Sequence, residues 1–237
     1  MNGQGEGQLT DLGKQQANNL GKRLSNIKFD HVYCSDLNRT RQTLEGILAH
    51  QPKETRDIVT YTKELREIQL NSVEDEPIEV IIKIRNDSGM YFRQAKNPNT
   101  EDENLVDVFY RISKFLDWLI QKYVKSDYES GINEDNYKII NDTDDLLDNE
   151  TLQKKFESGE FSNNKNKNVN QTILLVGHTR MIAETINNFL YRMGKKMGRN
   201  WDSKNTALYK FTIYKDSENE NKLLFSIDIW NDGSHNN

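Results

Sequence analysis

Two short stretches of the sequence place polar and cationic side chains directly after an apolar run. Residues 35–41, SDLNRTR, follow HVYC, and residues 177–180, GHTR, follow TILLV. Each stretch joins a predicted strand to a predicted helix, so free backbone N–H groups at a helix start lie beside a serine or a histidine and an arginine. Helix N-termini and arginine side chains commonly bind phosphate groups. The two stretches are therefore candidates for an anion site.

The individual residues are weaker signals than their combination. A lone histidine after a strand, such as His178, is more often structural than catalytic, and an arginine pair on a helix more often forms a solvated face. Arg39 and Arg41 are two residues apart on a helix start, so we expect only one of them to face a pocket. The two stretches support each other because both lie where α/β folds bind ligands, at the carboxyl ends of strands. The remaining histidines lack such support and are interpreted as structural or incidental: His31, His50 and His235.

Strands and helices alternate along the chain, which predicts an α/β fold. Thr10 or Asp11 is placed to cap the first helix, and Pro77 occupies the favoured first turn of the third. The apolar run at 171–177 is typical of a strand covered on both faces. We therefore expect a three-layer α/β/α sandwich with a mostly parallel sheet and a hairpin, 205–232, at one sheet edge. The predicted helices cover 9–26, 36–50, 77–87, 104–124 and 178–193, and the predicted strands cover 28–35, 57–65, 171–177, 205–215 and 222–232.

Length and composition favour one domain with an insertion. The 237 residues, 35% of them hydrophobic and 29% charged, suit a single domain over 1–237. Residues 126–170 are acidic and then rich in asparagine and lysine. Such a composition buries too little apolar surface to offset its ordering entropy. We expect this segment to be mostly disordered, with about one helical turn near 146–156.

Charge and cysteine content limit the partners and the compartment. The net charge of −5 argues against a nucleic-acid partner, which requires a basic surplus gathered on one face. The single cysteine, Cys34, excludes an internal disulfide, and the sequence has neither a long apolar run nor a secretion signal. We therefore expect a cytoplasmic protein without membrane contact. No spaced histidine or cysteine cluster indicates a metal, so no cofactor is expected, and the oligomeric state is left open.

Four ordered blocks of the sequence resemble the histidine phosphatase superfamily, the phosphoglycerate mutase-like proteins. They are LTDLGKQQANNLG at 9–21, FDHVYCSDLNRTRQTLEGIL at 29–48, ELREI at 64–68 and LLVGHTRMI at 174–182. Within this family the chain is most similar to fructose-2,6-bisphosphatase-type members, through SDLNRTRQTLEGIL, the long polar insertion and NTALYKFTIY. The resemblance implies a phosphoglycerate mutase-like fold.

The resemblance also implies phosphoryl transfer from a phosphorylated small molecule through a phosphohistidine. In this family a histidine attacks phosphorus, a glutamate protonates the leaving oxygen, and arginines with a second histidine bind the phosphate oxygens. Carried over by position, the catalytic residues are Glu67, as the general acid, and His178, as the second histidine. The residues that the resemblance assigns to substrate binding are Arg39, Thr179, Gln4 and Gly5.

The sequence departs from the family pattern at its start and beside the site. The chain begins MNGQGEGQ, and the Arg-His-Gly block that carries the nucleophile and the first arginine is not matched. We therefore expect the nucleophile to be absent here, and the N-terminal strand to be missing from the sheet interior, which would leave its two neighbours with unpaired edges. A truncated gene product would explain this. The family glycine after the second histidine is Thr179, and residues 101–103 carry two extra carboxylates that would repel an anion if they face inward.

Two functions of different classes fit these residues. The first is a phosphatase that hydrolyses a sugar bisphosphate such as fructose 2,6-bisphosphate, active in a full-length gene product and inactive in this chain as it stands. The second is a non-catalytic family member that binds a phosphorylated ligand or a partner protein through the same pocket. A mutase is less favoured, because a mutase needs a phosphohistidine that outlives product exchange and nothing in the sequence indicates one.

Overall fold

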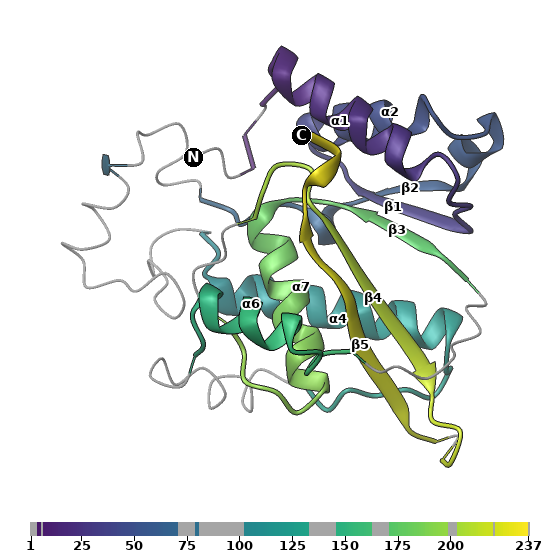
Figure 1. The fold of residues 1–237 in the computed structure, drawn as a ribbon, viewed down its shortest axis with the longest axis vertical. Helices are drawn as coiled ribbons and strands as arrows, with labels where there is room; N and C mark the ends of the chain where they lie inside the picture. Colours follow the sequence, from purple (N-terminus) through teal and green to yellow (C-terminus); the bar gives the residue numbers. More distant parts are fainter. Residues whose placement is uncertain are drawn as a thin grey trace.

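Three parallel strands form the centre of the protein (Figure 1). The computed structural model describes residues 4–5, 7–70, 79–80, 102–132, 146–162, 171–198, 203–219 and 221–236. The parallel sheet has the order β2-β1-β3, and a separate antiparallel pair contains β4 and β5. The mostly parallel α/β architecture predicted from the alternating elements is confirmed. The strands are β1 (His31–Ser35), β2 (Val59–Thr62), β3 (Ile173–Val176), β4 (Leu208–Lys215) and β5 (Leu223–Asp232).

The helices begin where the sequence places capping residues. Thr10 accepts the N–H of Gly13 at the start of the first helix, as predicted. No helix among the described residues is both long enough and apolar enough to cross a membrane. The helix predicted over 77–87 lies largely outside the described residues. The α-helices are α1 (Asp11–Leu24), α2 (Asn38–Leu48), α4 (Leu105–Tyr123), α6 (Asn149–Glu157) and α7 (Thr179–Arg192), and the 3₁₀ helices are η1 (Lys53–Ile58), η2 (Lys63–Leu65) and η4 (Ser234–Asn236).

Helices cover both faces of the parallel sheet, which gives the expected three layers (Figure 1). Successive residues of β1 point to opposite faces. Val32 and Cys34 are buried in a cluster with α1 and α2, whereas Tyr33 is buried in a second cluster with α4 and α7. In β3, Leu174 contacts the first cluster and Leu175 the second. The predicted strand covered on both faces is therefore explained by two separate hydrophobic layers.

Two glycines allow α1 and α2 to approach each other closely. A Cβ atom on Gly21 would lie 2.4 Å from the carbonyl oxygen of Gly46. A Cβ atom on Gly46 would lie 2.8 Å from the Cβ atom of Ala17. These contacts are with backbone and with a short side chain that cannot move aside. The close contact fixes α2, and with it the helix start that follows β1.

The hairpin of β4 and β5 forms as predicted, but it is not an edge of the parallel sheet. In the described residues, β3 pairs only with β1 and β4 pairs only with β5. The two sheets nevertheless share both hydrophobic layers. Leu208 and Leu174 pack against one cluster, and Phe211 and Leu175 pack against the other. The placement at the sheet edge was wrong, because an alternating apolar pattern predicts that a strand forms but not which strand it pairs with.

The segment expected to be mostly disordered contains a packed helix in its described part. Of residues 126–170, the structure describes 126–132 and 146–162. Leu152 in α6 is fully buried, and Phe156 and Phe161 stack on Trp230 of β5, with ring centroids 5.8 and 6.2 Å apart. The expected single helical turn underestimated α6, because its few apolar residues are stabilised by a strand distant in sequence. The other residues of this segment lie outside the described part of the chain.

Candidate functional site

The carboxyl ends of β1 and β3 bring Ser35 and His178 together. The two strands are parallel neighbours with Cys34 opposite Val176, so the residues that follow them lie at the same edge of the sheet. The Nε2 atom of His178 lies 3.0 Å from the Oγ atom of Ser35, and both side chains are buried. Ser35 Oγ also accepts the N–H of Leu37 at 3.4 Å. Its own hydrogen is therefore available to the imidazole.

His178 is held in its neutral form. Burial, together with the positive charges of Arg39 and Arg111, lowers the pKa of His178 to about 3, against the opposing effect of Asp36. At neutral pH the ring therefore keeps one N–H donor and one acceptor nitrogen. Such a ring can bind a phosphate oxygen through its N–H while the acceptor nitrogen receives the Ser35 hydroxyl.

Glu67 places its carboxyl group at the start of the helix that follows His178. One carboxyl oxygen accepts the N–H of Ile68 at 2.9 Å, and the other accepts the N–H of Arg180 at 3.4 Å. Burial raises the pKa of Glu67, and the positive charges of Arg180 and Arg39 oppose this effect only in part. A buried carboxyl group with a raised pKa can hold a proton and donate it. The geometry therefore suits a general acid.

The N-terminal loop lies against the acid and the arginine. The side-chain amide of Gln4 donates to the carbonyl of Glu67 at 3.1 Å and accepts from Arg66 at 3.0 Å. The guanidinium of Arg39 donates to the carbonyl of Gly5 at 3.0 Å. The structure therefore brings Gln4, Gly5, Arg39 and Glu67 into one region.

The other residues expected near the site differ in orientation. Arg41 donates to the carbonyl of Asp36 at 2.9 Å and lies over the ring of Tyr61, 4.2 Å from its centroid. The two arginines thus point in different directions, Arg39 toward Gly5 and Arg41 toward Asp36 and Tyr61. Thr179 is the first residue of α7 and has an exposed side chain. Its position next to His178 suits a backbone donor rather than a buried side-chain ligand.

A bidentate ion pair that the sequence did not predict joins the two sides of the site. The guanidinium of Arg66 donates to both carboxylate oxygens of Asp36, each at 2.6 Å, and lowers the pKa of that carboxyl. Asp36 follows Ser35 and Arg66 precedes Glu67, so the two residues lie in the family-like blocks at 29–48 and 64–68. Their sequence separation of 30 residues left no signal that they pair.

In the acidic loop before α4, Glu103 forms an ion pair with Arg111 of that helix. Both carboxylate oxygens of Glu103 bind the guanidinium of Arg111, at 2.9 and 3.0 Å. One of them also accepts the N–H of Gln69 at 2.9 Å. Glu103 stands at the glutamate of the family's Gly-Gly-Glu loop and pairs with Arg111, whereas the two extra carboxylates belong to residues 101 and 102. Residue 101 lies outside the described part of the chain.

The three histidines interpreted as structural or incidental each have a contact away from His178. His31 stacks on Tyr123, with ring centroids 4.4 Å apart. The other two are hydrogen-bonded, His50 to Asn18 and His235 to Thr206. Among the residues that the structure describes, no group of three or more histidine, cysteine, aspartate or glutamate side chains is arranged to hold a metal ion.

Comparison with known proteins gives a family and a set of relatives. The sequence profile described as "Histidine phosphatase superfamily (branch 1)" matches residues 1–128. The protein named fructose-2,6-bisphosphatase TIGAR from Mus musculus is 32% identical over 123 residues, which cover 51% of this chain and 45% of the mouse protein. The protein of that name from Bos taurus is 33% identical over 127 residues, covering 53% and 45%. The chain thus spans about half the length of the curated relatives that it matches.

Solved structures resemble the whole chain at lower sequence identity. Bacillus stearothermophilus YhfR superposes with a TM-score of 0.64 at 18% identity, covering 100% of this chain and 91% of the other. A mycobacterial glucosyl-3-phosphoglycerate phosphatase superposes with a TM-score of 0.62 at 16% identity, covering 98% and 90%. At these identities the similarity establishes the fold, which is that of the phosphoglycerate mutase-like phosphatases.

Proposed function

The chain belongs to branch 1 of the histidine phosphatase superfamily, and from this premise we propose that its site hydrolyses a phosphate monoester of a sugar, with a sugar bisphosphate such as fructose 2,6-bisphosphate as substrate. The observation that carries the proposal is the pairing of Glu67 with the start of α7. A buried carboxyl group of raised pKa accepts the N–H of Arg180, two residues after a neutral His178, and the positive charge of Arg39 acts on both groups.

The proposed reaction has two displacements at phosphorus. A histidine nitrogen forms a bond to phosphorus while the P–O bond to the sugar breaks, and Glu67 gives its proton to the departing oxygen. Water then attacks the phosphohistidine, Glu67 takes a proton from that water, and inorganic phosphate leaves. Arg39 and the N–H of His178 bind the phosphate oxygens, where negative charge collects in both transition states.

The nucleophile requires a position that the four histidines of this chain do not fill. His31, at the start of β1, is four residues from Ser35, or about 13 Å along the strand. We propose that the nucleophilic histidine enters on an extended segment that pairs with the edges of β3 and β4 for which the described residues supply no strand partner. The half-buried apolar side chains of Leu175 and Phe211 on these strands support this position.

The substrate class follows from the relatives' names. The curated relatives are named for fructose 2,6-bisphosphate, and a structural neighbour is named for glucosyl-3-phosphoglycerate. Each name describes a sugar bearing a phosphate ester or joined to a phosphorylated acid. A sugar phosphate leaves as an alkoxide, which needs the proton that Glu67 can supply.

The second candidate function is binding of a phosphorylated ligand without turnover. The observation that favours it is Thr179 beside His178, where the resemblance expects a glycine. Such a protein would retain the phosphate contacts of Arg39 and His178 and lack a covalent intermediate.

Release of inorganic phosphate from p-nitrophenyl phosphate and fructose 2,6-bisphosphate separates the two functions. The chain is assayed alone and with a synthetic apolar peptide that ends in Arg-His-Gly, and a peptide ending in Arg-Ala-Gly is the control. We expect turnover only with the histidine peptide, and its loss in His178→Ala. Turnover that survives His178→Ala would refute the site. Phosphate binding without turnover under every condition would favour the binding function.

A further inference from the structure

Arg111 of α4 uses its whole guanidinium to hold the segment that carries Glu67. Its Nε and Nη2 atoms donate to the two carboxylate oxygens of Glu103, at 2.9 and 3.0 Å. Its Nη1 atom donates to the carbonyls of Glu64 and Arg66, at 2.6 and 3.1 Å, and Nη2 also donates to the carbonyl of Glu67 at 3.5 Å. These contacts occupy all five N–H donors of the side chain. Arginine is the only residue type that offers this fork.

Glu103 completes the clamp from the other side. Its carboxylate accepts the N–H of Gln69, and its backbone N–H donates to the carbonyl of Gln69, both at 2.9 Å. The ion pair is largely shielded from water, since the side chains of Arg111 and Glu103 are 16% and 19% exposed. A shielded, bidentate pair is stronger and more rigid than a surface pair.

The clamped segment has no regular secondary structure of its own. After η2 ends at Leu65, residues 66–70 belong to neither a helix nor a strand. The carboxyl group of Glu67 nevertheless needs a fixed direction, because it accepts the N–H of Ile68 and that of Arg180 at the start of α7. The backbone contacts of Arg111 and Glu103 are what constrain this segment on the side of α4.

We propose that Arg111, together with Glu103, is a positioning residue that aims the carboxyl group of Glu67 at the start of α7. Its catalytic meaning rests on the proposed function, in which Glu67 is the general acid. The positioning itself depends only on the contacts above. A displacement of about 1 Å in a proton donor is enough to lower a rate by two orders of magnitude, so the clamp sets how well Glu67 can act.

Hydrogen exchange tests the positioning without any turnover. Arg111→Lys keeps the positive charge and removes the fork, and Arg192→Met removes another arginine of low exposure, paired with Asp117, as the matched control. We expect the amide of Ile68, which donates to Glu67, to exchange about tenfold faster in Arg111→Lys after correction for global stability. In Arg192→Met, we expect the exchange rate of the Ile68 amide to change only as far as global stability changes. Equal corrected exchange in Arg111→Lys and wild type would overturn the proposal.

Two substrates test the catalytic consequence in protein supplied with the histidine peptide. A sugar alkoxide needs a proton to leave, whereas p-nitrophenolate leaves without one. We expect Arg111→Lys to lower kcat for fructose 2,6-bisphosphate about tenfold more than kcat for p-nitrophenyl phosphate. Equal losses on both substrates would contradict positioning of the acid. Faster exchange at Ile68 with no turnover of either substrate by wild type would support the clamp and count against the proposed function.

Discussion

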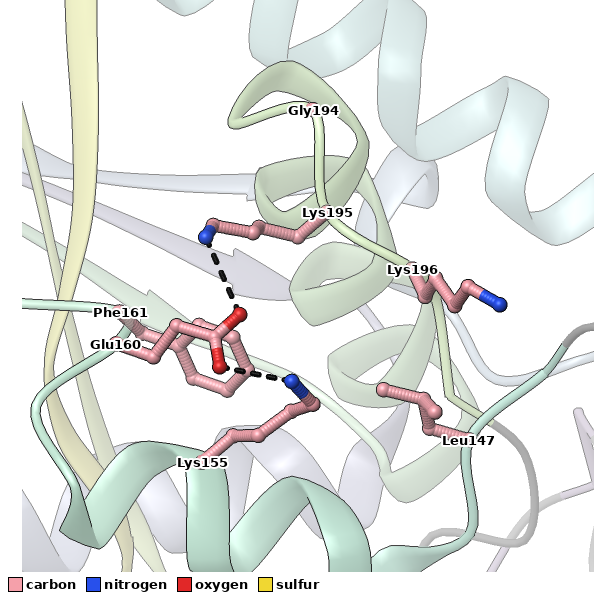
Figure 2. Close-up of a pocket in the computed structure, with 7 residues that line it drawn as sticks. All are labelled: Leu147, Lys155, Glu160, Phe161, Gly194, Lys195 and Lys196. Atoms are coloured by element: carbon pink, nitrogen blue, oxygen red, sulfur yellow. Dashed lines mark hydrogen bonds and ion pairs between the residues drawn. The ribbon is translucent and has the colours of Figure 1, made fainter.

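The two ends of α7 both gather titratable side chains, but their surroundings act on these side chains in opposite ways. At its start, His178 and Glu67 are buried and bonded to a hydroxyl and to backbone N–H groups. Beyond its end lies a cavity of about 240 Å³. Figure 2 shows that Glu160 there accepts from Lys155 and Lys195, at 2.8 and 3.1 Å. The cavity is lined by Leu147, Lys155, Glu160, Phe161, Gly194, Lys195 and Lys196.

The difference lies in what each environment does to protonation. Burial raises the pKa of Glu67 and lowers that of His178, so it favours the neutral form of both groups. The two lysines lower the pKa of Glu160, which favours its charged form. A neutral acid and a neutral imidazole can exchange protons and bind an anion, whereas Glu160 and its lysines neutralise one another. The burial of titratable groups at the start of α7 is therefore a stronger indication of a functional site than the cavity beyond the other end of the helix.

The largest expected effect is the acid sensitivity caused by His178. The folded protein keeps this ring neutral down to about pH 3, whereas the unfolded chain binds a proton below about 6.5. As pH falls through this window, the free energy of unfolding of wild type should therefore decrease, relative to that of His178→Gln, by about 1.4 kcal/mol for each pH unit. Urea unfolding between pH 7 and pH 4 measures it. Parallel curves for wild type and His178→Gln would contradict the burial argument.

Glu67 and Glu160 should respond to pH with opposite signs. The raised pKa of Glu67 contributes stability that is present below about 4.5 and is lost as pH rises through the folded value. The lowered pKa of Glu160 contributes stability that is present above about 4.5 and is lost as pH falls. Between pH 3 and pH 8, wild type should thus gain stability relative to Glu160→Gln as pH rises toward 4.5, and should lose stability relative to Glu67→Gln as pH rises above 4.5. Thermal unfolding across this range checks the pair, and two differences of the same sign would contradict it.

Local signals in the sequence predicted the elements that place the site. The cap at Thr10, the strand before Ser35 and the helix after His178 all lie where the apolar pattern placed them. These features depend on residues within one or two turns of each other, so a local pattern is enough to predict them. The α/β fold followed from their order along the chain.

Features that depend on distant partners could not be predicted in the same way. The ion pair of Asp36 with Arg66 and the clamp of Arg111 act through groups 30 to 47 residues apart, and the clamp acts mainly through backbone carbonyls that carry no sequence signal. The position of the hairpin next to the parallel sheet, and the burial of α6 on β5, likewise depend on neighbours that periodicity does not identify.

Glycine substitutions at the two ends of α7 should have unequal effects. A Cβ atom on Gly177 would lie 1.8 Å from the terminal methyl of Met181 and 3.3 Å from the carbonyl oxygen of Leu65, so Gly177→Ala should cost about 1 to 3 kcal/mol. Gly194 has a φ of 67° and open space around it, so Gly194→Ala should cost about 1 kcal/mol. Chemical denaturation measures both costs. A greater loss in Gly194→Ala would reverse the comparison.

The smallest expected effect is at the lysines of the cavity. The side chains of Lys155 and Glu160 are 35% and 32% exposed, and ion pairs of this kind contribute less than about 1 kcal/mol. Lys155→Met should therefore shift the urea midpoint only slightly, and 1 M salt should remove most of the shift. A loss of several kcal/mol would mean that the cavity stabilises the fold as strongly as the buried site.

Binding of inorganic phosphate, measured by calorimetry, tests most directly whether the start of α7 is the phosphate site. Arg39→Met removes the arginine that faces the N-terminal loop, and Lys195→Met removes a cation at the other end of the helix. A charged hydrogen bond is worth about 1.5 to 3 kcal/mol, so we predict at least about tenfold weaker binding in Arg39→Met and unchanged binding in Lys195→Met. Wild-type affinity in Arg39→Met, with weakened binding in Lys195→Met, would contradict the assignment of the site.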